Sequence, residues 1–108
     1  MGDATYSFAF DQQAVVAAFR GVAPRELTLA LVAAMTPDPA WEGCQVGLGE
    51  SPLGPGTVCI TTLGPFAGEL QLRLVESFER HGVPILQVYE GGPQSVTVLA
   101  TVRNGSWA

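Results

Sequence analysis

The sequence predicts an α+β domain in which helices cover one face of an antiparallel sheet. Three observations lead to this fold class. Segments in which apolar and polar residues alternate, as in half-buried strands, occur near both ends of the chain. Between them, apolar residues recur at helical spacing, most clearly from Glu69 to His81. Glycine or proline marks most of the boundaries between these segments.

The N-terminal part predicts one strand followed by two short helices or one broken helix. Residues 4–10 alternate as a strand whose buried face is aromatic, with Tyr6, Phe8 and Phe10. Asp11 can cap the helix that follows, from Gln12 to Arg20, because its carboxylate can accept from free backbone N–H groups. Gly21 ends this helix and Pro24 opens a second one, whose apolar stripe is Leu27, Leu31, Ala34 and Met35.

The middle of the chain predicts two strands and the longest helix. The first strand runs from Trp41 to Leu48, and a loop over 49–56 connects it to a second strand from Thr57 to Leu63. In the helix from Glu69 to His81, the side facing the sheet is expected to carry Leu70, Leu74 and Phe78. The side facing water is expected to carry Glu69, Arg73, Glu76 and Arg80.

The C-terminal part predicts a β-hairpin. Its strands are Pro84 to Glu90 and Ser95 to Arg103, joined by a turn at Gly91-Gly92-Pro93. Because the second strand comes last, we expect it at or near an edge of the sheet, where it can pair with another chain. Trp107 then either docks on a neighbouring molecule or folds back over its own core.

The predicted order is β-α-β-β-α-β with an extra C-terminal strand, in a single domain over residues 1–108. Ferredoxin-like two-layer sandwiches have this order of elements. Small ligand-sensing domains such as the ACT type resemble it at the same coarse level. No motif in the chain identifies a family.

Composition excludes several classes of function. The net charge is −5, the chain contains no lysine, and its five arginines are scattered, so no basic face exists for nucleic acid. The missing lysine also excludes Schiff-base and pyridoxal phosphate chemistry, and we expect no cofactor. Residues 1–4 carry no positive charge, and the apolar stretch from Leu27 to Met35 is too short for a membrane span. We therefore expect a cytoplasmic protein without a membrane partner.

The segment Gly64-Pro65-Phe66-Ala67-Gly68 lies between a predicted strand and a predicted helix, where backbone N–H groups can cradle an anion. A phosphate-binding loop of the P-loop kind needs a lysine after its last glycine, and here Glu69 follows. The segment is also too short for a dinucleotide-binding fingerprint. We therefore predict an ordinary turn from strand to helix.

Cys44, Cys59 and His81 are the side chains best suited to metal binding or nucleophilic catalysis. A structural zinc site takes four such ligands, so a site within one chain is not expected. Both cysteines lie in apolar runs and are predicted to be buried, and the loop length allows them to face each other across a hairpin. His81 is explained by the end of its helix, where a cationic ring is favourable. We interpret four acids near loops, Asp38, Glu42, Glu50 and Glu90, as solvated.

The sequence therefore predicts no catalytic, cofactor-binding or metal-binding residue. The function it favours is that of a small cytoplasmic binding or interaction module that self-associates as a homodimer or higher oligomer. Two alternatives stay open. One is a cofactor-independent enzyme of the dimeric α+β barrel kind, with His81 or a carboxylate as its acid–base group. The other is a regulatory domain that binds a small molecule between subunits.

Overall fold

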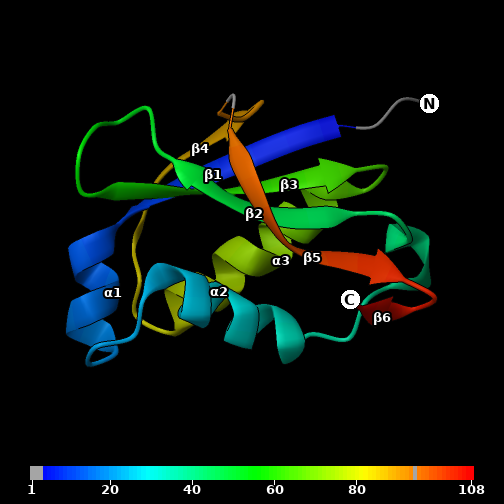
Figure 1. Cartoon of the computed structure of the whole chain (residues 1–108), viewed down its shortest axis with the longest axis horizontal. Coiled ribbons are helices and arrows are strands. Elements are labelled where there is room, and N and C mark those ends of the chain that lie inside the picture. The colour runs from blue at the N-terminus through cyan, green and yellow to red at the C-terminus, as the bar shows by residue number, and fades with distance from the viewer. Residues whose placement is uncertain (1–3, 94) are drawn as a thin grey trace.

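A computed structural model describes residues 4–93 and 95–108 of the chain. Met1, Gly2 and Asp3, three of the four N-terminal residues noted above for their lack of positive charge, lie outside the described residues. Figure 1 shows a sheet with its helices on one side, so the predicted α+β class is confirmed. The helices are α1 (Gln12–Ala18), α2 (Pro24–Ala33) and α3 (Ala67–Arg80), with a short 3-10 helix η1 (Pro39–Trp41). The strands are β1 (Ala4–Asp11), β2 (Gln45–Glu50), β3 (Thr57–Gly64), β4 (Ile85–Glu90), β5 (Val96–Arg103) and β6 (Ser106–Trp107).

The strands form one antiparallel sheet in the order β4-β1-β3-β2-β5-β6. This complete order differs from that of a four-stranded ferredoxin-like sandwich. The predicted hairpin of β4 with β5 is wrong, because β4 pairs with β1 and β5 pairs with β2. The physical reason is that glycine and proline suit a chain crossing as well as a tight turn. The connection between β4 and β5, of which residues 91–93 and 95 are described, carries the chain across the sheet instead of folding it back.

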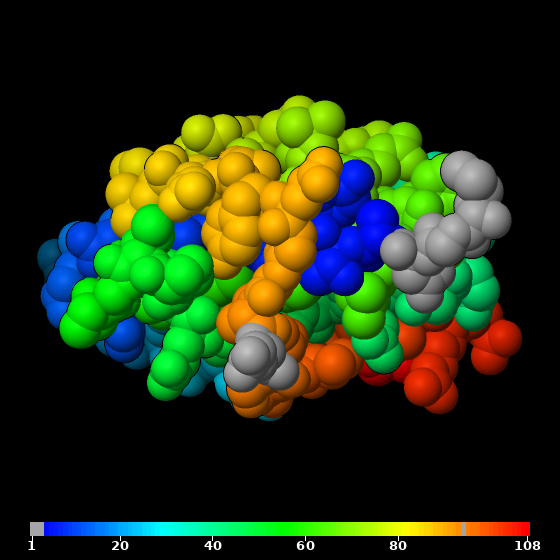
Figure 2. All heavy atoms as spheres, turned by 90° about the horizontal axis from the view of Figure 1, so that it is seen from above, coloured from blue at the N-terminus to red at the C-terminus, as the bar shows by residue number. Residues whose placement is uncertain are grey.

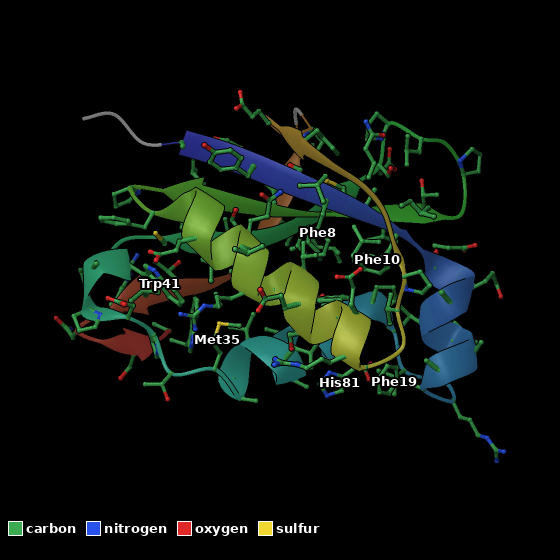
Figure 3. All side chains as sticks on the ribbon, turned by 180° about the vertical axis from the view of Figure 1, so that it is seen from behind. Phe8, Phe10, Phe19, Met35, Trp41 and His81 are labelled. Carbon is green, nitrogen blue, oxygen red and sulfur yellow. The ribbon has the colours of Figure 1, made fainter. Side chains whose placement is uncertain are left out.

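The core lies between the sheet and the helices. Figure 3 shows the rings of Phe8 and Phe10, from β1, between that strand and α3. Phe8 and Phe78 meet edge to face with ring centroids 5.3 Å apart, and Phe10 lies 5.1 Å from Phe78. The predicted phase of α3 is confirmed: Leu70, Leu74 and Phe78 are fully buried, whereas Glu69, Arg73, Glu76 and Arg80 are exposed.

Both predicted N-terminal helices are present. Asp11 accepts a hydrogen bond from the backbone N–H of Gln13 at 2.8 Å, which confirms it as the cap of α1. Gly21 has a positive φ of 72°, as expected for the residue that reverses the chain between α1 and α2. Pro24 begins α2, in which Leu27 and Leu31 are buried. Ala34, predicted for the same stripe, is exposed because the helix ends before it.

The predicted strand from Trp41 to Leu48 is partly wrong, because Trp41 belongs to η1 and β2 begins at Gln45. Pro39 favours the first turn of a helix, and Asp38 caps it by accepting from Ala40 N–H at 2.8 Å. The turn buries the indole of Trp41, whose Nε1–H donates to Glu69 at 3.3 Å.

The C-terminal tail lies on its own molecule. Trp107 pairs with Val102 in the β5–β6 hairpin, and its Nε1–H donates to the carbonyl of Met35 at 2.8 Å. The expectation that Trp107 docks on a neighbouring molecule is therefore wrong. β5 is also not a free edge along its whole length, because β6 covers its end.

A β-bulge in β5 changes which side chains reach the core. The pairing shifts between Val46↔Ala100 and Gly47↔Val98, so one extra residue, Leu99, lies between these pairs. As a result Val98 lies on the face away from the helices, while Ala100 is buried against them. The regular alternation predicted for this strand is broken at that point.

Candidate functional site

The connection between β4 and β5 crosses the open face of the sheet, which is the face without helices. Figure 2 looks onto this face and shows the orange residues of the connection between β4 and β5. Two hydrogen bonds fix its start to β1: Gly91 N–H donates to the carbonyl of Thr5 at 2.8 Å, and the Ser7 hydroxyl donates to the carbonyl of Gly91 at 2.5 Å. We call residues 91–93 and 95 the crossing segment, and its start is attached to β1.

Glycines let the crossing segment lie close to the strands beneath it. A Cβ on Gly92 would lie 3.1 Å from Thr61 Cγ2, and a Cβ on Gly49 would lie 2.8 Å from Cγ of Pro93. A Cβ on Gly47 would collide with the side chain of Val96. Glycines at alternate positions of β2 are thus needed for close approach. They are the sequence signal from which the crossing could have been found.

A chain of hydrogen bonds between polar side chains lies beneath the crossing segment. The Tyr89 hydroxyl lies 3.1 Å from the Cys59 sulfur, which lies 3.6 Å from the Thr61 hydroxyl. Thr61 in turn lies 3.1 Å from the Ser7 hydroxyl, which donates to the carbonyl of Gly91. Cys59 is buried as predicted, but its neighbours include two hydroxyl groups and are not only apolar.

The surroundings of Tyr89 raise the pKa of its hydroxyl group. Its partial burial, followed by the hydrogen bond and charge of Cys59, raises the pKa of Tyr89 to about 12, against a lowering by the Ser7 hydrogen bond. The folded protein therefore holds this phenolic proton more tightly than the unfolded chain, whose tyrosine has a pKa near 10. The contribution of Tyr89 to stability is present below pH 10 and is lost as the pH rises toward 12.

We expect Cys59 to react slowly with iodoacetamide at neutral pH. The thiol is fully buried, so reaction requires local opening and should be at least about a hundredfold slower than in the unfolded chain. Tyr89→Ala removes the side chain above the sulfur and should accelerate alkylation, as measured by mass spectrometry of peptides. Rapid alkylation of the unchanged protein at Cys59 would contradict the buried thiol.

A groove of about 490 Å³ lies on the open face beside the crossing segment. It is visible in Figure 2 as a recess bordered by the orange crossing segment, the blue start of β1 and the orange-red β5. Its lining combines neutral polar and apolar residues with several glycines: Thr5, Gln45, Gly47, Thr61, Leu63, Gly91, Gly92, Pro93, Val96 and Val98. A second, wider hollow lies on the other side of the crossing segment, next to the β2–β3 loop.

The chemistry of the groove is neutral. Within the described residues no charged side chain lines it. Leu63 and Val98 present exposed apolar surface, and Thr61 presents a hydroxyl that is already fixed by its neighbours. Thr5 and Gln45 also line the groove, and between them they offer hydrogen-bond donors and acceptors. Such a lining can hold an uncharged molecule and can orient its polar edge.

The two cysteines are not neighbours. Cys59 pairs with Gly49 across the β2–β3 hairpin and lies on the open face. Cys44 lies before β2 and belongs to the core on the helix side, where its sulfur approaches Gly64. The arrangement that the loop length allowed, with the two cysteines facing each other across the hairpin, is therefore not the one observed, whereas both are buried as predicted.

His81 is the C-cap residue of α3, in the helix layer and away from the groove (Figure 3). Its Nδ1 lies 2.7 Å from the carbonyl of Ser77, so Nδ1–H donates to a carbonyl of the last turn that also accepts from the backbone N–H of His81. The ring also lies 6.2 Å from that of Phe19. These contacts agree with its interpretation as a helix-end residue.

Two of the four acids near loops have local roles. Asp38 caps η1, and the Glu42 carboxylate accepts from the N–H groups of Asn104 and Gly105 at 2.8 and 3.2 Å. Glu50 and Glu90 are the last residues of β2 and β4. In the part of the chain that the structure describes, no three His, Cys, Asp or Glu side chains gather as metal ligands would.

The segment from Gly64 to Gly68 is a strand-to-helix turn in which glycines allow close packing. A Cβ on Gly68 would lie 3.2 Å from the ring of Tyr6, and one on Gly64 would lie 2.8 Å from Cα of Cys44. Glu69 occupies the first turn of α3, where its carboxylate accepts from Trp41. This arrangement leaves an acid where an anionic ligand would bind.

Neither the length of the helices nor comparison with known proteins indicates which class of protein this chain belongs to. None of the helices in residues 4–93 and 95–108 has the length and apolar character that crossing a membrane requires. No family model, curated protein or solved structure matches the chain.

Proposed function

We propose that this protein is a binding module without catalytic activity, which takes a small uncharged molecule into the open-face groove. The observation that carries the proposal is the lining of the groove, in which apolar walls and neutral hydrogen-bonding groups lie together. A charged ligand would lose hydration there without gaining an opposite charge. The peptide planes of Gly91 and Gly92 offer flat surfaces without side chains, which suit a planar ring.

The absence of an acid–base group from the lining supports a binding role over an enzymatic one. The hydroxyl and thiol groups beneath the crossing segment donate to one another or to a backbone carbonyl. A hydroxyl or thiol nucleophile needs a base within hydrogen-bonding reach, and neither histidine nor a carboxylate lines the groove within the described residues. An enzyme of the dimeric α+β barrel kind would also have to accommodate the crossing segment on its open face.

We also propose that the protein is a homodimer and that it acts in the cytoplasm. We further propose that the fold is a ferredoxin-like two-layer sandwich with added C-terminal strands. The partial order β4-β1-β3-β2 supports it, with β5 and β6 as additions beside β2.

A regulatory domain that senses the bound molecule is the second candidate, and the attachment of the crossing segment to β1 favours it. In this candidate function, a molecule in the groove changes the hydrogen bonds between the crossing segment and β1, and this change alters the position of β1 in the sheet.

Indole is a suitable probe for the groove because it is flat, uncharged and has one N–H donor. We expect indole to shift the backbone amide resonances of Gly47, Thr61 and Val98 saturably in ¹⁵N-edited NMR spectra. Indole-3-carboxylate has the same ring and a negative charge, and it should shift them far less. Equal shifts with both compounds, or none with either, would contradict the proposed neutral site.

A pair of valine substitutions controls this experiment. Val98→Glu places a charge in the groove and should abolish the indole-dependent shifts. Val16→Glu places the same charge on α1, where the valine is 41% exposed and outside the groove, and should leave the shifts unchanged. Loss of binding in both variants would indicate a general effect of charge and would argue against the groove.

A further inference from the structure

We infer that two copies of this chain associate by antiparallel pairing of their β4 strands, which joins the two sheets into one. This inference rests on the proposed homodimer and assigns its interface. It does not depend on ligand binding in the groove. β4 is the outer strand at one end of the sheet, and within residues 4–93 and 95–108 its pairing partner is β1 alone. Among the described residues, no strand pairs with its other side, which is therefore an open edge.

The backbone of β4 offers its outward groups at defined positions. Gly91 N–H bonds the carbonyl of Thr5, and the register continues through Tyr89↔Ser7 and Gln87↔Ala9. In an antiparallel ladder, hydrogen-bonded pairs alternate with pairs whose N–H and C=O groups point the other way. The backbone groups of Val88 and Glu90 therefore point away from β1, toward a strand that could pair with them.

Two exposed apolar side chains, Leu86 and Val88, lie on this edge strand together with the exposed polar side chains of Gln87 and Glu90. Leu86 and Val88 are each 53% exposed, and Leu72 on the neighbouring α3 is 57% exposed. Leu72 belongs to α3, which contacts β4, and it follows Gln71, whose Nε2–H donates to the carbonyl of Ser7 in β1. We call Leu72, Leu86 and Val88 the β4 rim. Burial of the rim would add hydrophobic stabilisation to the backbone hydrogen bonds.

The occupant best matched to the β4 rim is a second copy of the same rim. Pairing about a two-fold axis at Val88 brings two valines together and separates the two Glu90 carboxylates, since Glu90 is the last residue of β4. The three rim side chains carry no charge, and Glu90 is the single charged side chain of β4, so this edge offers little to attract a strongly charged partner. The strand contains neither proline nor lysine, the residues that commonly protect an edge from pairing.

The other end of the sheet favours a closed dimer over a filament. There, β6 pairs with the last residues of β5 and shortens the available edge. Isologous pairing through β4 uses the same surface on both chains, so it closes after two copies. Each chain carries a net charge of −5, and salt that screens this repulsion should strengthen the dimer.

Sedimentation equilibrium combined with residue-resolved amide exchange tests this interface in the full chain. We expect a dimer that forms with increasing protein concentration. The amides of Val88 and Glu90 should exchange more slowly as the dimer forms. The amides of Gln87 and Tyr89, already paired with β1, should change little. A monomer at every concentration would overturn the inference, as would a dimer in which the amides of Val88 and Glu90 stay fast.

Charge substitutions locate the interface independently. Val88→Glu places two like charges opposite each other at the two-fold axis and should leave a monomer with the same far-ultraviolet circular dichroism. Val16→Glu, at a similarly exposed valine on α1, should remain dimeric. If Val88→Glu does not fold, Leu72→Glu on the exposed side of α3 supplies the same test. A dimer that survives the folded substitution would overturn the β4 pairing. Because indole binding is measured separately, failure of the β4 interface can be distinguished from failure of the proposed ligand-binding groove.

Discussion

Replacing Leu74 by alanine is expected to lower the free energy of unfolding by about 2–5 kcal/mol. Leu74 is fully buried on the side of α3 that packs against the sheet. Its truncation removes apolar contacts and leaves a cavity that the surrounding rings cannot fill completely. Urea denaturation followed by circular dichroism measures the change, and a shift of the midpoint at constant slope identifies a loss of stability.

Arg73→Ala is the matched control on the neighbouring position of the same helix. Arg73 is exposed, and its guanidinium carbon lies 5.9 Å from the ring centroid of Trp41. An exposed cation–π contact contributes up to about 1 kcal/mol, so this substitution should cost less than about 1 kcal/mol. Equal losses from Leu74→Ala and Arg73→Ala would mean that the two faces of α3 have been assigned wrongly.

Local signals in the sequence were sufficient to predict the helices. Their signals act within one or two turns: the carboxylate of Asp11, the ring of Pro24 and the repeat of Leu70, Leu74 and Phe78. Each of these is visible without knowledge of any distant contact. Trp41 shows the limit, because an aromatic residue before a strand also suits a short 3-10 turn after proline.

The arrangement of the strands could not be predicted in the same way. Gly91, Gly92 and Pro93 are compatible with a hairpin turn and with a crossing of the sheet, and only the positions of β2 and β5 decide between them. The bulge at Leu99 likewise depends on pairing with Val46 and Gly47, which lie about 50 residues away in the sequence.

The candidate groove was not predicted for a related reason. Its polar and apolar residues come from β1, β2, β3, β5 and the crossing segment, so no short motif contains them. Sequence reasoning correctly identified Cys59 as buried, but it could not supply Tyr89 and Thr61 as its neighbours. Glycines at alternate positions of β2, Gly47 and Gly49, were the one local signal that the open face is crossed closely.

Replacing Gly64 by alanine is expected to destabilise the protein by about 2–6 kcal/mol, from backbone strain and overpacking of about 1–3 kcal/mol each. Gly64 has a φ of 141°, which residues with a side chain rarely adopt. An added Cβ would lie 2.8 Å from both Cα and Sγ of Cys44. The Cα atom belongs to the backbone and cannot move aside by a change of rotamer, so the β2–β3 pairing beside it would have to shift.

Gly82→Ala separates the two causes of this loss. Gly82 also has a positive φ, 84°, but an added Cβ would meet no atom within 4 Å. Its replacement should therefore cost only the backbone term, about 1–2 kcal/mol for a left-handed residue. Urea denaturation of both variants gives the comparison. A cost at Gly64 no larger than that at Gly82 would show that Cys44 can yield to the added methyl group. A clearly larger cost would assign the glycine at the end of β3 to close packing against Cys44, in agreement with its position in an ordinary strand-to-helix turn.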